Sequence, residues 1–159
     1  MLDFAPVFKN RHLADLAVRE LTAVHKKHQA RLHAFVMMPE HFHFVTTLSE
    51  TQNSIAFVDR LKTRIAETIL RELTPDEKSL FDMQRGLNRR QFWRPSFRGF
   101  KVEGEEMFWQ KVGYTHLNPV RRGLVLYAEE YRWSSAKLYL GGHWSETEGV
   151  PFKMDDLPE

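Results

Sequence analysis

The sequence of 159 residues contains no cysteine. Disulfide bonds, thiolate zinc sites and cysteine nucleophiles are therefore excluded, and the lack of disulfides fits a reducing compartment. No apolar run approaches the roughly 20 residues of a membrane-spanning helix. The N-terminal segment "MLDFAPVFKNRH" lacks the apolar core of a signal peptide. We therefore expect a soluble cytoplasmic protein with no membrane partner.

The sequence also lacks internal repeats and low-complexity segments. Hydrophobic residues make up 42% of the chain and aromatic residues 13%, which is typical of a compact globule. The length is that of one domain with a full-sized core. We expect a single domain over residues 1–159, with an acidic, flexible tail from about residue 145.

Acidic residues are missing from residues 85–101, although the net charge of the whole chain is only +2. The cations of this segment are Arg85, Arg89, Arg90, Arg94, Arg98 and Lys101, and the interleaved aromatic residues are Phe92, Trp93, Phe97 and Phe100. Cations can follow phosphates while aromatic rings stack on bases, so a single-stranded nucleic acid is one partner that fits. The alternative is a pair of solvated strands whose aromatic side chains belong to the core.

The N-terminal half shows clear hydrophobic periods. Residues 12–30 have helical spacing, and residues 31–38 and 41–48 read as two strands of a hairpin around a tight turn. Cap residues at 51–54 precede a helix from about 55 to 73. Its expected buried stripe is Ile55, Val58, Ile65 and Ile69.

The C-terminal half is less regular. Residues 90–102 look like one or two short strands around Pro95 and Gly99. Residues 104–117 read as a helix that stops at Asn118-Pro119. Turns and a short helix follow. The whole order predicts an α+β fold in which helices pack on an antiparallel sheet.

The segment "PEHFHF" places two histidines one residue apart. On a strand, His41 and His43 project to one face while Phe42 and Phe44 point to the other, into the core. Two imidazoles can converge on one cation, but a third ligand is needed from elsewhere. Glu40 lies at the turn and is a poor candidate for the same face. His33, across the hairpin, is expected at the strand surface.

A second candidate lies in "QKVGYTHLNPVRRGLV", residues 110–125. If this helix forms, Tyr114 and Asn118 are four residues apart and share one face. A tyrosine can attack phosphorus when a cation withdraws charge from the phosphate, and an Asn oxygen one turn away could complete the shell begun by the histidines. The structural alternative is that Asn118-Pro119 only stops or caps a helix and that Tyr114 is an ordinary half-buried ring.

Five segments, taken in order, resemble the REP-associated tyrosine transposases, a branch of the single-tyrosine HUH transposases that act on single-stranded DNA. They are "AFVMMPEHFHFV", "FVDRLKTRIA", "FWRPSFRGF", "YTHLNPVRRGLV" and "EEYRWSSAKLY". The resemblance runs from about Val7 to Tyr139. Its specificity lies in the combination of HUH, then Tyr-x-x-x-Asn-Pro-Val-Arg, then Trp-Ser-Ser.

This resemblance implies a ferredoxin-like α+β fold, with the histidines on a central strand and the tyrosine on a later helix. His41 and His43 would bind Mg²⁺ or Mn²⁺, with Asn118 as third protein ligand. Tyr114 would be the nucleophile that leaves a 5′-phosphotyrosyl enzyme and a free 3′-OH. The partners implied are single-stranded DNA and hairpin-forming palindromes. The implied phosphate contacts are Arg89, Arg90, Arg94, Arg98, Arg121, Arg122 and Lys62.

One departure from the family concerns the first strand. Members have a full sheet strand before the first helix, whereas only "MLDFAPVF" precedes it here and Pro6 interrupts the pattern. Either the strand is shortened, a second copy completes the sheet in a homodimer, or the chain is a trimmed derivative. Two further functions stay open: a DNA-hairpin-binding protein that has lost catalysis, and a metal-dependent hydrolase of small substrates.

Overall fold

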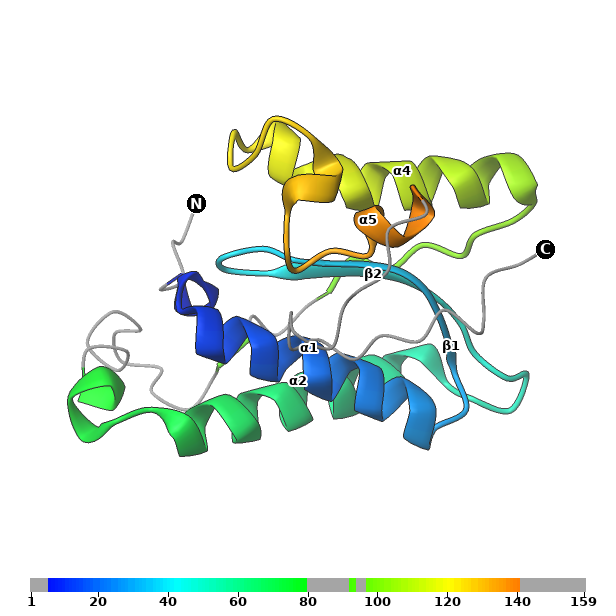
Figure 1. The fold of residues 1–159 in the computed structure, drawn as a ribbon. Coiled ribbons are helices and arrows are strands. Elements are labelled where there is room, and N and C mark those ends of the chain that lie inside the picture. Colours follow the sequence, from blue (N-terminus) through cyan, green and yellow to red (C-terminus); the bar gives the residue numbers. More distant parts are fainter. Residues whose placement is uncertain (1–5, 80–91, 94–96, 141–159) are drawn as a thin grey trace.

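The computed structural model describes residues 6–79, 92–93 and 97–140. A two-stranded antiparallel sheet lies between two helical layers, with α1 and α2 on one face and α4 and α5 on the other (Figure 1). In chain order the elements are η1 (Val7–Lys9), α1 (Arg11–Lys27), β1 (Arg31–Met37), β2 (Phe42–Thr47), α2 (Ser54–Glu72), α4 (Glu105–Arg121), η2 (Ala128–Glu130) and α5 (Ala136–Tyr139). The α+β class predicted from the sequence is confirmed. Within the described residues, no helix has the length and apolar character to span a membrane.

Helix α1 follows the spacing of its apolar residues. The Asn10 side chain caps it by accepting hydrogen bonds from the backbone N–H groups of His12 (3.0 Å) and Leu13 (3.4 Å). Leu13, Leu21 and their neighbours at helical spacing are buried against the sheet. At its other end, Lys26 and Lys27 occupy the last turn, where positive charge stabilises the helix dipole.

Helix α2 runs beside α1 and buries a stripe that differs from the predicted one at its start. Val58, Ile65 and Ile69 are buried as expected, but Ile55 is 59% exposed. The ring of His28, just past the end of α1, lies 6.1 Å from the ring of Phe57. The packing of α1 on α2 therefore begins at Phe57, and Ile55 lies beyond it. A helical segment, residues 75–79, follows α2.

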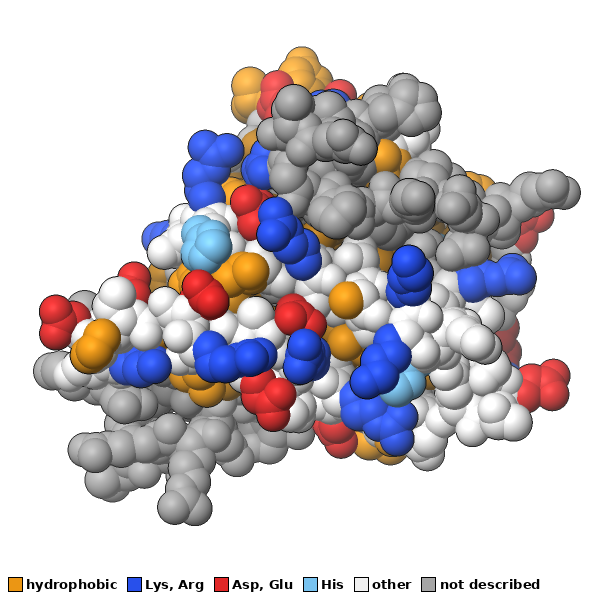
Figure 2. Space-filling model, turned by 60° about the horizontal axis from the view of Figure 1, so that its bottom comes forward, with side chains coloured by type: hydrophobic (Ala, Val, Ile, Leu, Met, Phe, Trp, Pro, Cys, Tyr) orange, Lys and Arg blue, Asp and Glu red, His pale blue; other side chains and the backbone are white. Residues whose placement is uncertain are grey.

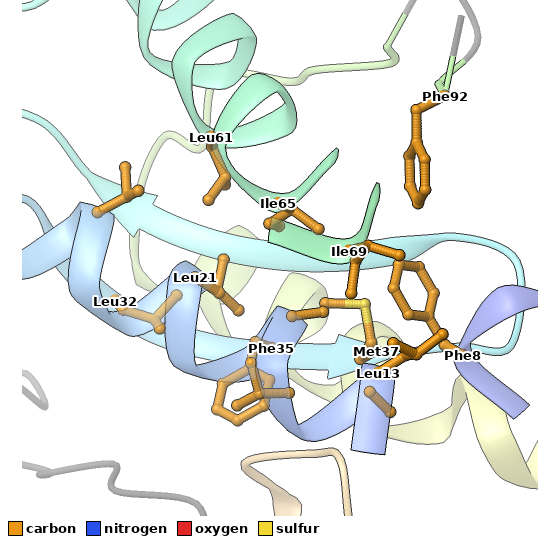
Figure 3. Packing of buried hydrophobic residues seen from close by; sticks show 14 of the residues in the cluster. Phe8, Leu13, Leu21, Leu32, Phe35, Met37, Leu61, Ile65, Ile69 and Phe92 are labelled. Carbon is orange, nitrogen blue, oxygen red and sulfur yellow. The ribbon is translucent and has the colours of Figure 1, made fainter. Parts of the chain in front are cut away.

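The hairpin forms the centre of the core. Phe35 pairs with Phe44, and Val36 pairs with His43. Every residue of β1 after Arg31 is buried, because helices cover both faces of the strand. One buried hydrophobic cluster fills the space between the sheet and the layer of α1 and α2. Its side chains come from η1, α1, β1 and α2, and Phe92 lies at one end (Figure 3). The prediction that His33 lies at the surface was wrong: its side chain is buried, and its Nε2 lies 2.7 Å from Thr47 Oγ1.

The strands predicted within residues 90–102 are absent from the described part of this segment, residues 92–93 and 97–102. Side-chain contacts hold Phe92 and Trp93 in place, and not the backbone hydrogen bonds of a β-sheet. Both rings pack near Phe8, and Trp93 Nε1 donates a hydrogen bond to the Lys62 carbonyl oxygen at 2.7 Å. At the N-terminus, the described residues 7–9 form η1 where a short strand was an alternative. Residues 1–5 and the expected acidic tail lie outside the described ranges.

The edge of β1 that does not face β2 is covered by residues 131–135, here called the clamp segment. Met37 N–H donates to the Trp133 carbonyl (2.8 Å), and Ser135 N–H donates to the Phe35 carbonyl (3.0 Å). The Tyr131 hydroxyl donates to the Met37 carbonyl at 2.9 Å. These bonds satisfy backbone groups that would otherwise be buried without partners. The clamp segment is also tied to α1, since Trp133 Nε1 donates to Asp15 at 2.8 Å.

The Ser135 hydroxyl connects three parts of the molecule. It accepts a hydrogen bond from Phe35 N–H at 2.9 Å and lies 2.8 Å from Nε2 of His116, which belongs to α4. Ser135 is fully buried. One hydroxyl therefore fixes the clamp segment, the strand edge and the helix that carries Tyr114 relative to one another.

We predict that Ser135→Ala lowers the free energy of unfolding by about 2–3 kcal/mol, because it leaves a buried backbone N–H and an imidazole nitrogen without a partner. Ser134→Ala is the matched control. Its hydroxyl is equally buried but accepts one hydrogen bond, from Ala136 N–H at 3.1 Å. Urea denaturation of both variants measures the difference, and equal losses would contradict the connecting role of Ser135.

Candidate active site

The histidine pair lies on the face of the hairpin that α4 covers. His43 belongs to β2 and His41 immediately precedes it, and their ring centroids are 4.9 Å apart. Phe42 and Phe44 project to the opposite face, where they pack on the core with α1 and α2. The alternation expected from the sequence therefore holds, and the two imidazoles share one side of the sheet.

Helix α4 places Tyr114 against this pair. The Tyr114 ring lies 5.8 Å from the ring of His43, edge to face. Its side chain is 46% exposed, so the hydroxyl group can meet a ligand from solvent. The Arg121 guanidinium lies 4.9 Å from the centroid of the Tyr114 ring. Residues that are seventy positions apart in the sequence thus meet at one partly open site.

The helix that holds Tyr114 is longer than the sequence predicts. It was expected to stop at Asn118-Pro119, yet α4 continues through Pro119 to Arg121. A proline inside a helix leaves the carbonyl four residues earlier without its usual donor, here that of Thr115. The Asn118 side chain supplies a replacement, since its Nδ2 donates to the Thr115 carbonyl at 3.4 Å and to the Tyr114 carbonyl at 2.8 Å.

These hydrogen bonds also orient the Asn118 amide. Its nitrogen faces the backbone of α4, so the oxygen is the end of the amide that is turned away from that backbone. Asn118 is 8% exposed and lies one turn after Tyr114. A carbonyl oxygen is a ligand that Mg²⁺ and Mn²⁺ accept. The role of Asn118 as third metal ligand stays a prediction.

Burial sets the protonation of the histidines. Desolvation, followed by the charge of His41, lowers the pKa of His43 to about 4. Desolvation also lowers the pKa of His41, an effect that the Glu40 carboxylate partly opposes. Both rings are therefore neutral at neutral pH and have a nitrogen lone pair, as a metal ligand must. In the described part of the chain, no group of three or more His, Cys, Asp or Glu residues is arranged to hold a metal ion. A cation bound by the two imidazoles would therefore need further ligands. These would be the Asn118 oxygen, or oxygens of DNA and water.

Glu40 was judged a poor candidate for a ligand on this face, and in the structure it contacts His41 and Arg122 instead. Its Oε1 lies 3.2 Å from His41 Nδ1 and 2.7 Å from the guanidinium of Arg122. A carboxylate can only accept, so the Nδ1 of His41 carries the proton and the lone pair of the neutral ring lies on Nε2. Glu40 also joins the hairpin turn to the end of α4 through Arg122. The signal in the sequence was its position next to His41, which was discounted because turn residues need not follow the alternation of a strand.

The remaining predicted DNA contacts are spread over the molecule. Arg121 and Arg122 flank the site at the end of α4, and Arg98 is exposed in the segment before α4. Arg89, Arg90 and Arg94 lie outside the described residues. Lys62 lies on α2, across the sheet from α4, on a side of the molecule where lysine and arginine are interspersed with acidic residues (Figure 2). The structure thus does not bring Lys62 to the site, and its contact with DNA stays a prediction.

Helices cover both faces of the antiparallel hairpin (Figure 1), and the histidine pair lies beside the helix that carries Tyr114. The family described as "Transposase IS200 like" matches residues 5–110, so the chain belongs to this family. The matched range contains the histidines and ends before Tyr114.

One solved structure has a similar fold. It is described as "Structure of the REP associates tyrosine transposase bound to a REP hairpin", and it aligns with a TM-score of 0.60 at 18% identity, covering 91% of this chain and 78% of the other. At this identity the likeness is one of fold. A search of curated proteins finds no match. The family match confirms that the chain is a member of the IS200-like transposases, and the solved REP-associated transposase shares its fold.

We predict opposite shifts in the pKa of His41 from the two residues beside it. Glu40 raises this pKa and Arg122 lowers it. Glu40→Gln should therefore lower the pKa of His41 further, and Arg122→Gln should raise it. An NMR pH titration of the His41 ring signals measures both shifts, and an unchanged His41 titration in the two variants would contradict the arrangement around Glu40.

Proposed function

We propose that this protein is a metal-dependent transesterase of single-stranded DNA, a transposase-like enzyme that cleaves and rejoins strands through a 5′-phosphotyrosine intermediate. The observation that carries the proposal is the contact between Tyr114 and His43, with their ring centroids 5.8 Å apart in one open site. Membership of the IS200-like transposases supports the same chemistry.

Tyr114 is the tyrosine best suited to be the nucleophile. The chain has four tyrosines. Tyr131 and Tyr139 each donate their hydroxyl to a backbone carbonyl, and burial raises the pKa of both to about 12. Tyr127 is exposed on the approach to η2. Tyr114 combines an exposed ring, a contact with the histidine pair and a cation beside it.

In the proposed reaction, the Tyr114 phenol oxygen forms a bond to phosphorus and loses its proton. The bond from phosphorus to the 3′ oxygen breaks, and that oxygen takes up a proton to become a free 3′-OH. No water is consumed, so the reverse reaction can join strands. Mg²⁺ or Mn²⁺ bound by His41, His43 and Asn118 would supply charge withdrawal from the phosphate. Arg121, beside the Tyr114 ring, stabilises the negative charge that develops as the phenol is deprotonated.

The proposed substrate is DNA at hairpin-forming palindromic repeats. Two observations support it: the basic and aromatic residues before α4, and the fold shared with a transposase whose structure was determined with a REP hairpin. The exposed Arg98 and Arg121 suit phosphate contacts. A homodimer, in which a second copy supplies part of the site, is not needed for the contact between Tyr114 and His43, since both belong to the same chain.

We predict that the protein forms a covalent adduct with labelled single-stranded hairpin DNA in Mn²⁺, visible on a denaturing gel. Tyr114→Phe should abolish the adduct because it removes the attacking oxygen, and chelation should do the same. His41→Ala should slow adduct formation by about 10²–10³-fold, the loss typical of one charge-stabilising group. Tyr127→Phe, at an exposed tyrosine outside the site, is the control and should form the adduct at the normal rate.

The second candidate function is a DNA-hairpin-binding protein of the same fold without catalysis. One departure from the family pattern favours it: residues 7–9 form η1, where family members are expected to have a sheet strand. Hairpin binding without any adduct, equal in wild type and Tyr114→Phe, would establish this function and overturn the transesterase.

A further inference from the structure

Gly113 is the residue of α4 that packing does not explain. It lies in the interior of the helix, one residue before Tyr114. A Cβ placed on it would meet no atom within 4 Å, and its φ is not in the positive range that requires glycine. Glycine inside a helix is destabilising relative to alanine. The fold would therefore be more stable with a side chain at this position.

The missing side chain leaves a hollow on the outer face of α4. Its volume is about 340 Å³, and it opens to solvent. The described residues that line it are Trp109, Gln110, Lys111, Gly113, Tyr114, Leu117 and Arg121. The proposed nucleophile thus lines the same hollow as Gly113.

The aromatic and cationic side chains that line the hollow suit a ligand with a flat, uncharged ring and an attached anion. Trp109 and Tyr114 are 45% and 46% exposed, so both aromatic rings are accessible. Arg121 stands over the Tyr114 ring, and Lys111 Nζ lies 4.7 Å from the centroid of the exposed Phe100 ring. One carboxylate is near: Glu105 Oε1 accepts from Trp109 Nε1 at 3.4 Å, on the edge of that ring. Base stacking on aromatic rings with flanking cations is how single-stranded nucleic acid is bound without base pairing.

We infer that the hollow at Gly113 binds one unstacked nucleobase of single-stranded DNA, next to the phosphate that Tyr114 attacks. The inference rests on the proposed function for the identity of its ligand. The base lies against Trp109, and Arg121 and Lys111 meet the adjoining phosphates. Gly113 then determines how closely the strand approaches the nucleophile, because any side chain there occupies the place of the base.

The test is photocrosslinking to a short single-stranded oligothymidylate in which thymine is replaced by 5-iodouracil, followed by peptide mapping. This probe needs no knowledge of the cleavage sequence. Wild type should crosslink at Trp109 or Tyr114. Gly113→Leu should reduce this crosslink about tenfold, the loss expected for one base–aromatic stack, and Gly113→Ala should reduce it less. Glu106→Leu places the same side chain on α4 outside the hollow and should leave the crosslink unchanged.

Thermal melting tests whether a lost crosslink results from unfolding of the variant. Both Gly113 variants should melt at or above the wild-type temperature, since each replaces a glycine inside a helix. Crosslinks of equal yield in wild type and Gly113→Leu, or crosslinks that map only to residues outside the hollow, would overturn the inference.

The two proposals fail separately. A normal rate of Tyr114 adduct formation in Gly113→Leu would reject the base-binding hollow and leave the transesterase intact. A Trp109 crosslink that depends on Gly113, in a protein that forms no adduct, would support the hollow and reject the transesterase.

Discussion

The Ser135 hydroxyl, with His116 on one side and the backbone of Phe35 on the other, determines where α4 lies on the sheet. Because helices have no backbone register with a strand, side chains must fix their relative position. Here one buried hydroxyl does so through His116, which lies two residues after Tyr114 and is buried together with Thr115. The position of Tyr114 next to the histidines therefore depends on packing at the edge of β1 that does not face β2. None of the residues that pack there has a proposed chemical role.

Local features of the hairpin turn and of α4 complete the site. Asn118 compensates for the break that Pro119 would make, which lets the helix extend to Arg121 and Arg122. Those two arginines then reach the Tyr114 ring and Glu40. A helix that ended at Asn118 would leave both the tyrosine and the carboxylate without a cation. The Asn-Pro pair, which looked like a stop signal, is the means by which the cations reach the site.

Sequence patterns predicted the hairpin, the faces of its histidines and the extents of α1 and α2, because alternation and helical spacing are local properties. The role of the Trp-Ser-Ser residues could not be predicted this way. Their backbone pairs with β1, a strand about a hundred positions earlier, and nothing in their own spacing indicates that partner. His33 was misjudged for the same reason, because its environment is set by Phe108 of α4 and Tyr139 of α5, which come much later in the chain. The contact of Glu40 with Arg122 was likewise not predicted. The contact of Tyr114 with the histidines was expected from family resemblance, and periodicity alone left it open.

The central claim is that His41 and His43 bind a divalent cation beside Tyr114, the proposed nucleophile. Titration with Mn²⁺, followed by paramagnetic broadening of the ring signals of histidine and tyrosine in NMR spectra, tests it directly. The account predicts that the signals of His41 and His43 broaden first, with Tyr114 close behind, while those of His12 and His28, on α1 and just past its end, stay sharp at the same Mn²⁺ concentration. Broadening that begins at other histidines, or that leaves His41 and His43 sharp, would contradict it.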